Sequence, residues 1–148
     1  MVERRVFVQA PPRTVWRTLH DPGCVALIYP ELRLGPAAPS WPAASITRSA
    51  RVRVGFLREQ ARVESLEARP ESTFRLRATG SGFESEWVWR LEPVAGGTRV
   101  VHQGSFEPID RWSSILVRLG RATLASRVEG HLRTLKERSE AAERSFPR

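Results

Sequence analysis

His102 is the one titratable side chain that the sequence places on a strongly aromatic strand face, together with Val100 and Phe106. An imidazole in such surroundings can hold a ligand hydroxyl or carbonyl group, or transfer a proton as an acid or base. No carboxylate stands at a spacing that would orient the ring. A buried histidine is also often only a hydrogen-bonded core residue. The sequence therefore predicts His102 as a polar ligand contact and predicts no catalytic residue.

The aromatic face belongs to two segments with period-2 alternation, 83–92 and 98–106, which flank the pair Gly96-Gly97. Such a pattern predicts an antiparallel hairpin. In the first segment Phe83, Trp87, Trp89 and Leu91 share one face, and charged residues dominate the other. This wall is larger than simple sheet packing needs and is typical of the lining of an apolar pocket. Core packing between a sheet and a helix is the alternative, and both interpretations stay open.

Motifs for other chemistries are missing from the sequence. It has no nucleophile elbow, no phosphate-binding glycine loop and no zinc-protease signature. The single cysteine, Cys24, cannot form an internal disulfide, and no metal-ligand cluster surrounds it. His102 and His131 alone would make a poor metal site. We therefore expect neither a metal nor another cofactor.

The composition bounds the class of protein. The 148 residues predict one domain, over 1–140, with a polar tail at 141–148. The net charge is +8, but the basic residues, almost all arginine, are dispersed along the chain and interleaved with glutamate. This dispersal predicts no nucleic-acid partner, while anionic ligands and membrane surfaces stay possible. The sequence lacks a long apolar run and a signal peptide, so we expect a cytoplasmic protein without a transmembrane segment.

The expected elements follow from periodicity and from breaker residues. The C-terminal third is helical, but its apolar stripe shifts between Leu119 and Leu124, with Gly120 in the gap. Either the helix kinks there or its two halves pack against different surfaces. The remaining elements are a strand at 2–10, helices at 12–20 and 24–29, a loop at 31–41, and strands at 46–57, 60–68 and 73–79.

The order of these elements carries a resemblance to a known family. The matching segments are Val6–Trp16, Leu19–Asp21, Tyr29-Pro30, Trp89–Val101 and Leu132–Glu140. Together they resemble the START-like (SRPBCC) superfamily, which has the Bet v 1-type helix-grip fold, and within it the bacterial polyketide cyclase/dehydrase-like group. The resemblance implies an α+β fold in which a curved antiparallel β-sheet wraps around a long C-terminal helix. Two short helices follow the first strand.

The resemblance also implies an apolar cavity between the sheet and the C-terminal helix, and it places Tyr29 and Trp41 in segments that border its mouth. Ordinary loop packing is the alternative for these two residues, and we favour it. We expect a small hydrophobic or amphipathic ligand there, such as a lipid, a sterol or a polyketide-like molecule. The predicted lining residues are Phe56, Phe74, Trp87, Trp89, His102, Leu124 and Val128.

Two other functions stay open at this point. A cyclase, aromatase or dehydratase could use the same cavity, with His102 as acid or base. A protein-interaction module would be favoured by a solid core without a cavity. The sequence decides neither between these functions nor the oligomeric state.

Overall fold

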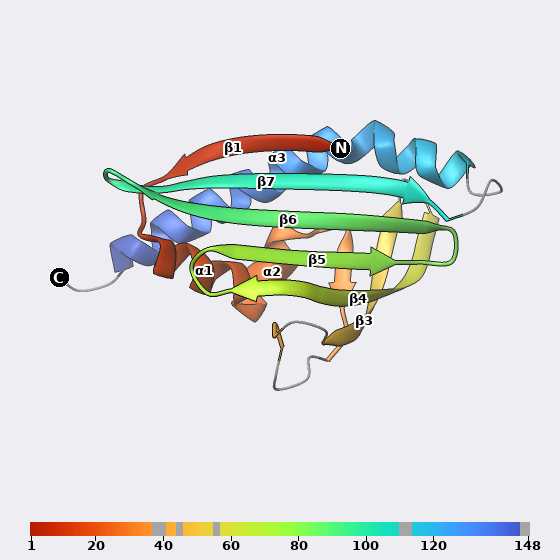
Figure 1. Ribbon diagram of the computed structural model, residues 1–148, viewed down its shortest axis with the longest axis horizontal. Coiled ribbons are helices and arrows are strands. Elements are labelled where there is room, and N and C mark those ends of the chain that lie inside the picture. Colours follow the sequence, from red (N-terminus) through yellow and green to blue (C-terminus); the bar gives the residue numbers. More distant parts are fainter. Residues whose placement is uncertain (37–40, 44–45, 55–56, 110–113, 146–148) are drawn as a thin grey trace.

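The computed structural model describes residues 1–36, 41–43, 46–54, 57–109 and 114–145 (Figure 1). In these ranges the strands form one seven-stranded antiparallel sheet in the order β1-β7-β6-β5-β4-β3-β2. The predicted α+β helix-grip architecture is therefore confirmed. In chain order the elements are β1 (Val2–Val8), α1 (Pro12–His20), α2 (Pro22–Ile28), β2 (Leu32–Leu34), β3 (Thr47–Val54), β4 (Leu57–Arg69), β5 (Thr73–Thr79), β6 (Phe83–Val94), β7 (Gly97–Pro108) and α3 (Ser114–Ser145).

The β6–β7 hairpin forms as the alternation predicts. Gly96 occupies the turn with φ +83°, a conformation that glycine adopts without steric cost. The register pairs Trp89 with His102 and Trp87 with Gly104 across the two strands. Because side chains alternate between the faces of a strand, these four positions lie on the inner face of the sheet.

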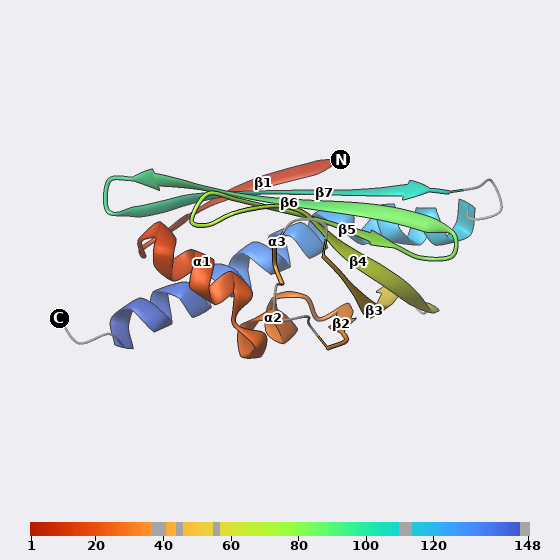
Figure 2. The ribbon, with the colours of Figure 1, turned by 60° about the horizontal axis from the view of Figure 1, so that its bottom comes forward.

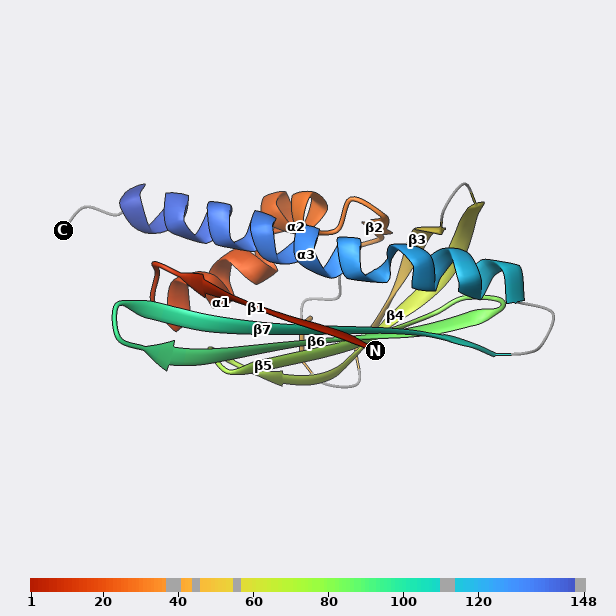
Figure 3. The ribbon, with the colours of Figure 1, turned by 90° about the horizontal axis from the view of Figure 1, so that it is seen from above.

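All three helices lie on the inner side of the sheet, as two views along different directions show (Figures 2 and 3). Helix α3 continues through Gly120 without interruption and includes the first part of the expected polar tail. Its buried residues recur at helical spacing, which gives the apolar stripe predicted for its second half. They are Leu124, Val128, His131, Leu132, Leu135 and Ser139.

Two elements near the start of the chain differ from the sequence-based expectation. Helix α2 begins at Pro22 rather than Cys24, because the Asp21 carboxylate accepts a hydrogen bond from the Gly23 backbone amide at 3.0 Å and caps the helix. The expected loop at 31–41 contains the edge strand β2, which pairs with β3. A strand of three residues is too short to show a period, so the alternation could not predict it.

Within the described ranges, no helix combines the length and the apolar composition needed to cross a bilayer.

Candidate functional site

His102 and His131 form a buried pair between the sheet and α3. Their exposed fractions are 0% and 1%, and His102 Nε2 lies 3.0 Å from His131 Nδ1. His102 comes from β7 and His131 from the buried stripe of α3. The two histidines, which come from separate elements, are thus in direct hydrogen-bond contact.

A carboxylate completes this pair from a distant part of the chain. Glu31 Oε1 lies 2.6 Å from His131 Nε2, although the two residues are 100 positions apart. Glu31 follows α2 and is only 9% exposed. The sequence predicted no carboxylate that could orient a histidine, and the contact made by Glu31 shows that this prediction is wrong. Sequence spacing cannot reveal a contact made between separate elements.

The Val88 carbonyl oxygen fixes the protons along this chain of groups. It lies 3.0 Å from His102 Nδ1 and can only accept, so Nδ1 carries a hydrogen. Burial, together with the charge of His131, lowers the pKa of His102 well below its ordinary value, so this ring is neutral. Its Nε2 then holds a lone pair and accepts from His131 Nδ1–H.

The remaining proton lies between His131 and Glu31. Burial raises the pKa of Glu31, but the hydrogen bond and positive charge of His131 outweigh it, and the net pKa falls below the ordinary value. Glu31 is therefore a carboxylate that accepts from His131 Nε2–H. His131 therefore donates through both ring nitrogens, to His102 and to Glu31.

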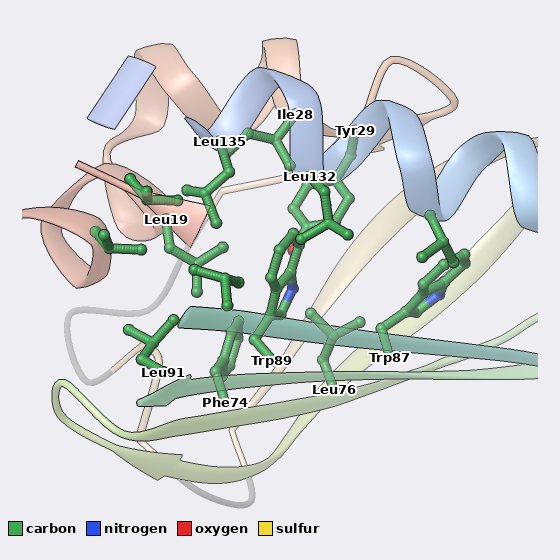
Figure 4. Close-up of a cluster of buried hydrophobic side chains, with 14 of the residues drawn as sticks. Leu19, Ile28, Tyr29, Phe74, Leu76, Trp87, Trp89, Leu91, Leu132 and Leu135 are labelled. Atoms are coloured by element: carbon green, nitrogen blue, oxygen red, sulfur yellow. The ribbon is translucent and has the colours of Figure 1, made fainter. Parts of the chain in front are cut away.

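Aromatic rings enclose the two histidines. The ring of Trp89 stacks on His102 with a centroid distance of 3.5 Å and an interplanar angle of 13°. Trp89 Nε1 donates to the Tyr29 hydroxyl at 2.8 Å. In the close-up, Trp87 and Trp89 rise from the strands towards α3, where Leu132 faces them (Figure 4). These contacts are those of a packed hydrophobic core.

A cavity of about 810 Å³ lies beside this core, between α1, α2 and strands β2 to β5. Its size falls in the range of small-molecule sites. Most of its lining residues have apolar side chains. The lining consists of Leu19, His20, Pro22, Val25, Ala26, Tyr29, Pro30, Leu32, Arg33, Leu34, Trp41, Arg48, Val63, Phe74 and Leu76.

Besides Arg33 and the Trp41 indole, three side chains with polar groups line these walls. The Arg48 guanidinium lies over the Trp41 ring, 5.1 Å from its centroid, and donates to the Gly35 carbonyl oxygen through Nε and Nη2. Its Nη1 has no partner among the described residues. The Tyr29 hydroxyl accepts from Trp89, and its own hydrogen has no acceptor in the described ranges.

The third polar group is His20, at the end of α1. Its ring packs edge-on against Phe74, with centroids 4.7 Å apart, and its buried Nε2 has no hydrogen-bond partner in the described part of the chain. Burial lowers the pKa of His20 to about 4, so the ring is neutral near pH 7.

The structure distributes the predicted lining residues over different places. Phe74 lines the cavity, and Phe56 lies outside the described residues. The others, which are Trp87, Trp89, His102, Leu124 and Val128, are buried between the sheet and α3. Trp87 also borders a void of about 20 Å³, close to the size of one water molecule. Ligand contact at these residues stays a prediction.

Sequence reasoning missed most of the cavity wall. Leu19, Val25, Val63 and Leu76 read as ordinary core positions, because an apolar residue beside a cavity has the same periodicity as one in a packed core. The available signal was the family resemblance, which placed Tyr29 and Trp41 near the cavity mouth. Both residues do line the cavity.

Within the described residues, no group of three or more histidine, cysteine, aspartate or glutamate side chains is arranged to hold a metal ion. For the buried pair of His102 and His131, the hydrogen-bond directions explain why the ring nitrogens are not available to bind a metal ion. Of the four nitrogens in the two rings, His102 Nε2 alone has a lone pair, and it already accepts from His131.

Solved structures with the same fold come from diverse sources. TTHA0849 from Thermus thermophilus is 24% identical, with a TM-score of 0.73 over 95% of this chain and 97% of that one. The Zhui aromatase/cyclase from Streptomyces sp. R1128 is 16% identical, with a TM-score of 0.75 over 97% and 95% of the two chains. Ara h 8.0201 is 11% identical, with a TM-score of 0.61 over 95% and 97%. At these identities the likeness shows the fold alone.

No curated protein matches the sequence. Residues 1–140, however, match a family described as "Polyketide cyclase / dehydrase and lipid transport". This match spans all the elements that build the sheet, the cavity and most of α3, and it confirms the SRPBCC-type resemblance found in the sequence. The chain belongs to the polyketide cyclase/dehydrase and lipid transport family.

Proposed function

We propose that the protein binds a small amphipathic molecule in the cavity between α1, α2 and strands β2 to β5. The observation that carries this proposal is the cavity of about 810 Å³ itself, with an apolar wall and a few polar groups. Such a site buries a hydrophobic ligand and orients it through a small number of hydrogen bonds. We therefore retain the binding function predicted from the sequence, but we propose this cavity as its site in place of the space between the sheet and α3.

The polar groups favour a ligand with an oxygen-rich end. Arg48 Nη1 and the Tyr29 hydroxyl are both donors without a partner in the described ranges, and a guanidinium binds carboxylate or carbonyl oxygen well. A fatty acid, or a polyketide-like chain with carbonyl groups, meets both requirements. A pure hydrocarbon would leave these donors unpaired at a cost in binding free energy.

Tryptophan fluorescence tests the proposal, because the tryptophans occupy different environments. Trp41 lies on the cavity wall, whereas Trp87 and Trp89 belong to the packed core. Titration with fatty acids, sterols and aromatic polyketides is expected to change the emission for at least one ligand class. The change should disappear in Trp41→Phe and persist in Trp87→Phe.

A cavity-filling variant gives a second test with a matched control. Val25→Phe adds volume inside the cavity and should weaken binding. Leu27→Phe is the control on the same helix. Leu27 is 46% exposed and does not line this cavity, so this substitution should leave binding unchanged. An emission change that Trp87→Phe removes and Trp41→Phe keeps would instead place the ligand beneath α3. A flat titration for every ligand class would refute binding.

The family description and the aromatase/cyclase neighbour also support an enzyme that uses the same cavity. In that case Tyr29, a free hydroxyl donor, and the neutral His20 are the polar groups beside a polyketide-like substrate. The side chain of His102 does not line the cavity, so we no longer assign it the acid–base role. Turnover of a polyketide substrate that is lost in Tyr29→Phe, while ligand affinity is retained, would favour this alternative. A cytoplasmic location remains our expectation for either function.

A further inference from the structure

The fold gathers arginines that are dispersed in the sequence. Strands β2, β3 and β4 pair in a register that sets Arg33 opposite Arg51 and Arg53 opposite Arg58. Residues opposite each other in a sheet share a face, so these side chains lie together on the outer side. Arg62, paired with Ser49, extends the group. We call this surface the arginine face; it consists of the exposed residues Arg33, Arg51, Arg53, Arg58 and Arg62.

The arginine face differs from the rest of the sheet in its charge balance. The arginines of β5 and β7 form ion pairs with glutamates on β6, such as Arg77 with Glu84 and Arg99 with Glu92. Within the described residues, no arginine of the arginine face forms an ion pair. Like charges directly opposite each other destabilise a sheet. Folding alone therefore does not explain this arrangement.

We propose that the arginine face docks the protein on an anionic phospholipid membrane. The first argument is charge complementarity, since each basic residue near an anionic bilayer contributes to binding, and neighbouring ones act together. The second is position. Arg33 belongs to the arginine face and also lines the cavity, so the docked face would border the cavity where it reaches the surface. This docking does not require a ligand in the cavity.

The chemistry of the face favours a membrane over a nucleic acid. Its other described residues on β3 and β4 are Thr47, Ser49, Gln60 and Glu64, with no aromatic ring on which a base could stack. It is a strand surface, and no described helix projects from it to enter a groove, because all three helices lie on the other side of the sheet (Figure 2). Lipid phosphates need only positive charge at a surface.

Vesicle co-sedimentation tests the proposal with two charge-matched variants. Arg51→Gln/Arg53→Gln removes two arginines from the arginine face and one member of each opposed like-charge pair. Arg5→Gln/Arg99→Gln removes the same amount of charge from strands β1 and β7, at the opposite edge of the sheet. There Arg5 and Arg99 form exposed ion pairs with Glu3 and Glu92. Both are compared with the wild-type protein on vesicles of phosphatidylcholine alone and of phosphatidylcholine with phosphatidylglycerol.

We expect the wild-type protein to bind only the vesicles that contain phosphatidylglycerol, and to dissociate at high salt. The Arg51→Gln/Arg53→Gln variant should bind about thirtyfold more weakly, the combined effect of two basic residues near an anionic surface. The Arg5→Gln/Arg99→Gln variant should bind as the wild type does. Thermal unfolding of the Arg51→Gln/Arg53→Gln variant should occur at or above the wild-type temperature, which separates lost docking from lost folding.

Several outcomes would overturn the proposal. Equal losses in both double variants would mean that net charge alone drives adsorption. No binding to the anionic vesicles, or tighter binding to an RNA or DNA oligonucleotide at the same salt, would also overturn it. Ligand titration of the Arg51→Gln/Arg53→Gln variant keeps the two proposals distinct, since binding in the cavity should be unaffected.

Discussion

The ring of Trp87 covers Gly104 so closely that a β-carbon at position 104 would lie 2.6 Å from Trp87 Cζ3. The two residues are paired across β6 and β7, and the Val128 side chain of α3 closes the same space at 3.1 Å. The absence of a side chain at Gly104 is thus what allows a large indole to fit between the sheet and α3.

Gly104→Ala should therefore destabilise the protein. The added methyl group cannot fit without moving the Trp87 ring, and overpacking of this kind costs about 1–3 kcal/mol in the free energy of unfolding. Chemical denaturation followed by circular dichroism measures the change. An unchanged midpoint would show that Trp87 can move freely.

Gly130→Ala is the matched substitution with the opposite expected sign. Gly130 lies within α3, and no atom outside the helix's own backbone lies within 4 Å of the position of a β-carbon there. Alanine favours a helix interior over glycine by about 0.5–1 kcal/mol, so the free energy of unfolding should rise. A loss of stability in the same denaturation assay would contradict the open space at this position.

The buried ion pair between Glu31 and His131 should show strong coupling in a double-mutant cycle. His131→Leu leaves a buried carboxylate without its partner, and such a loss costs about 3–5 kcal/mol. The double variant Glu31→Leu/His131→Leu should be less destabilised than the sum of the single variants, by more than about 1 kcal/mol. Additive single effects would show that the two side chains act independently.

Acid should weaken the fold, and His20 should account for part of this effect. Its folded pKa of about 4 lies below the ordinary value of 6.5, so the unfolded state binds more protons as the pH falls. Stability is then fully present above about pH 6.5 and decreases towards pH 4, by up to about 3 kcal/mol for this group. Denaturation of the wild type and of His20→Gln across this range should show a smaller decrease in the variant.

The lowered pKa values of His102 and Glu31 also reduce the free energy of unfolding as the pH falls. The His20→Gln variant should therefore still lose some stability in acid. Identical pH profiles for the wild type and His20→Gln would show that the His20 ring titrates normally in the folded protein.

The parts of the fold that follow from local pattern were predicted well. Helix α1 and strand β5 have the bounds that periodicity gave, and the β6–β7 hairpin forms around its glycine turn. Family resemblance supplied the topology that periodicity alone could not. Edge strand β2 escaped prediction because it is short, and its existence depends on pairing with β3.

The candidate site was harder to predict, because it depends on contacts between distant segments. Glu31 contacts His131 only when α2 and α3 have packed together, and no sequence pattern indicates that these two residues form a pair. The same holds for the arginine face, in which the pairing of three strands turns a dispersed composition into a local concentration of charge. Register, more than composition, determines where charges meet.

Because the cavity lies beside the core and not within it, different residues determine the shape of the cavity and the stability of the core. Substitutions among Val25, Ala26 and Leu34 change the shape of the cavity, whereas the Trp89–His102 stack depends on ring contacts and hydrogen bonds made by other residues. The core beneath α3 can therefore stay fixed while the shape of the cavity changes. Directed evolution of this chain could begin at these wall positions, because substitutions there leave the buried stack in place.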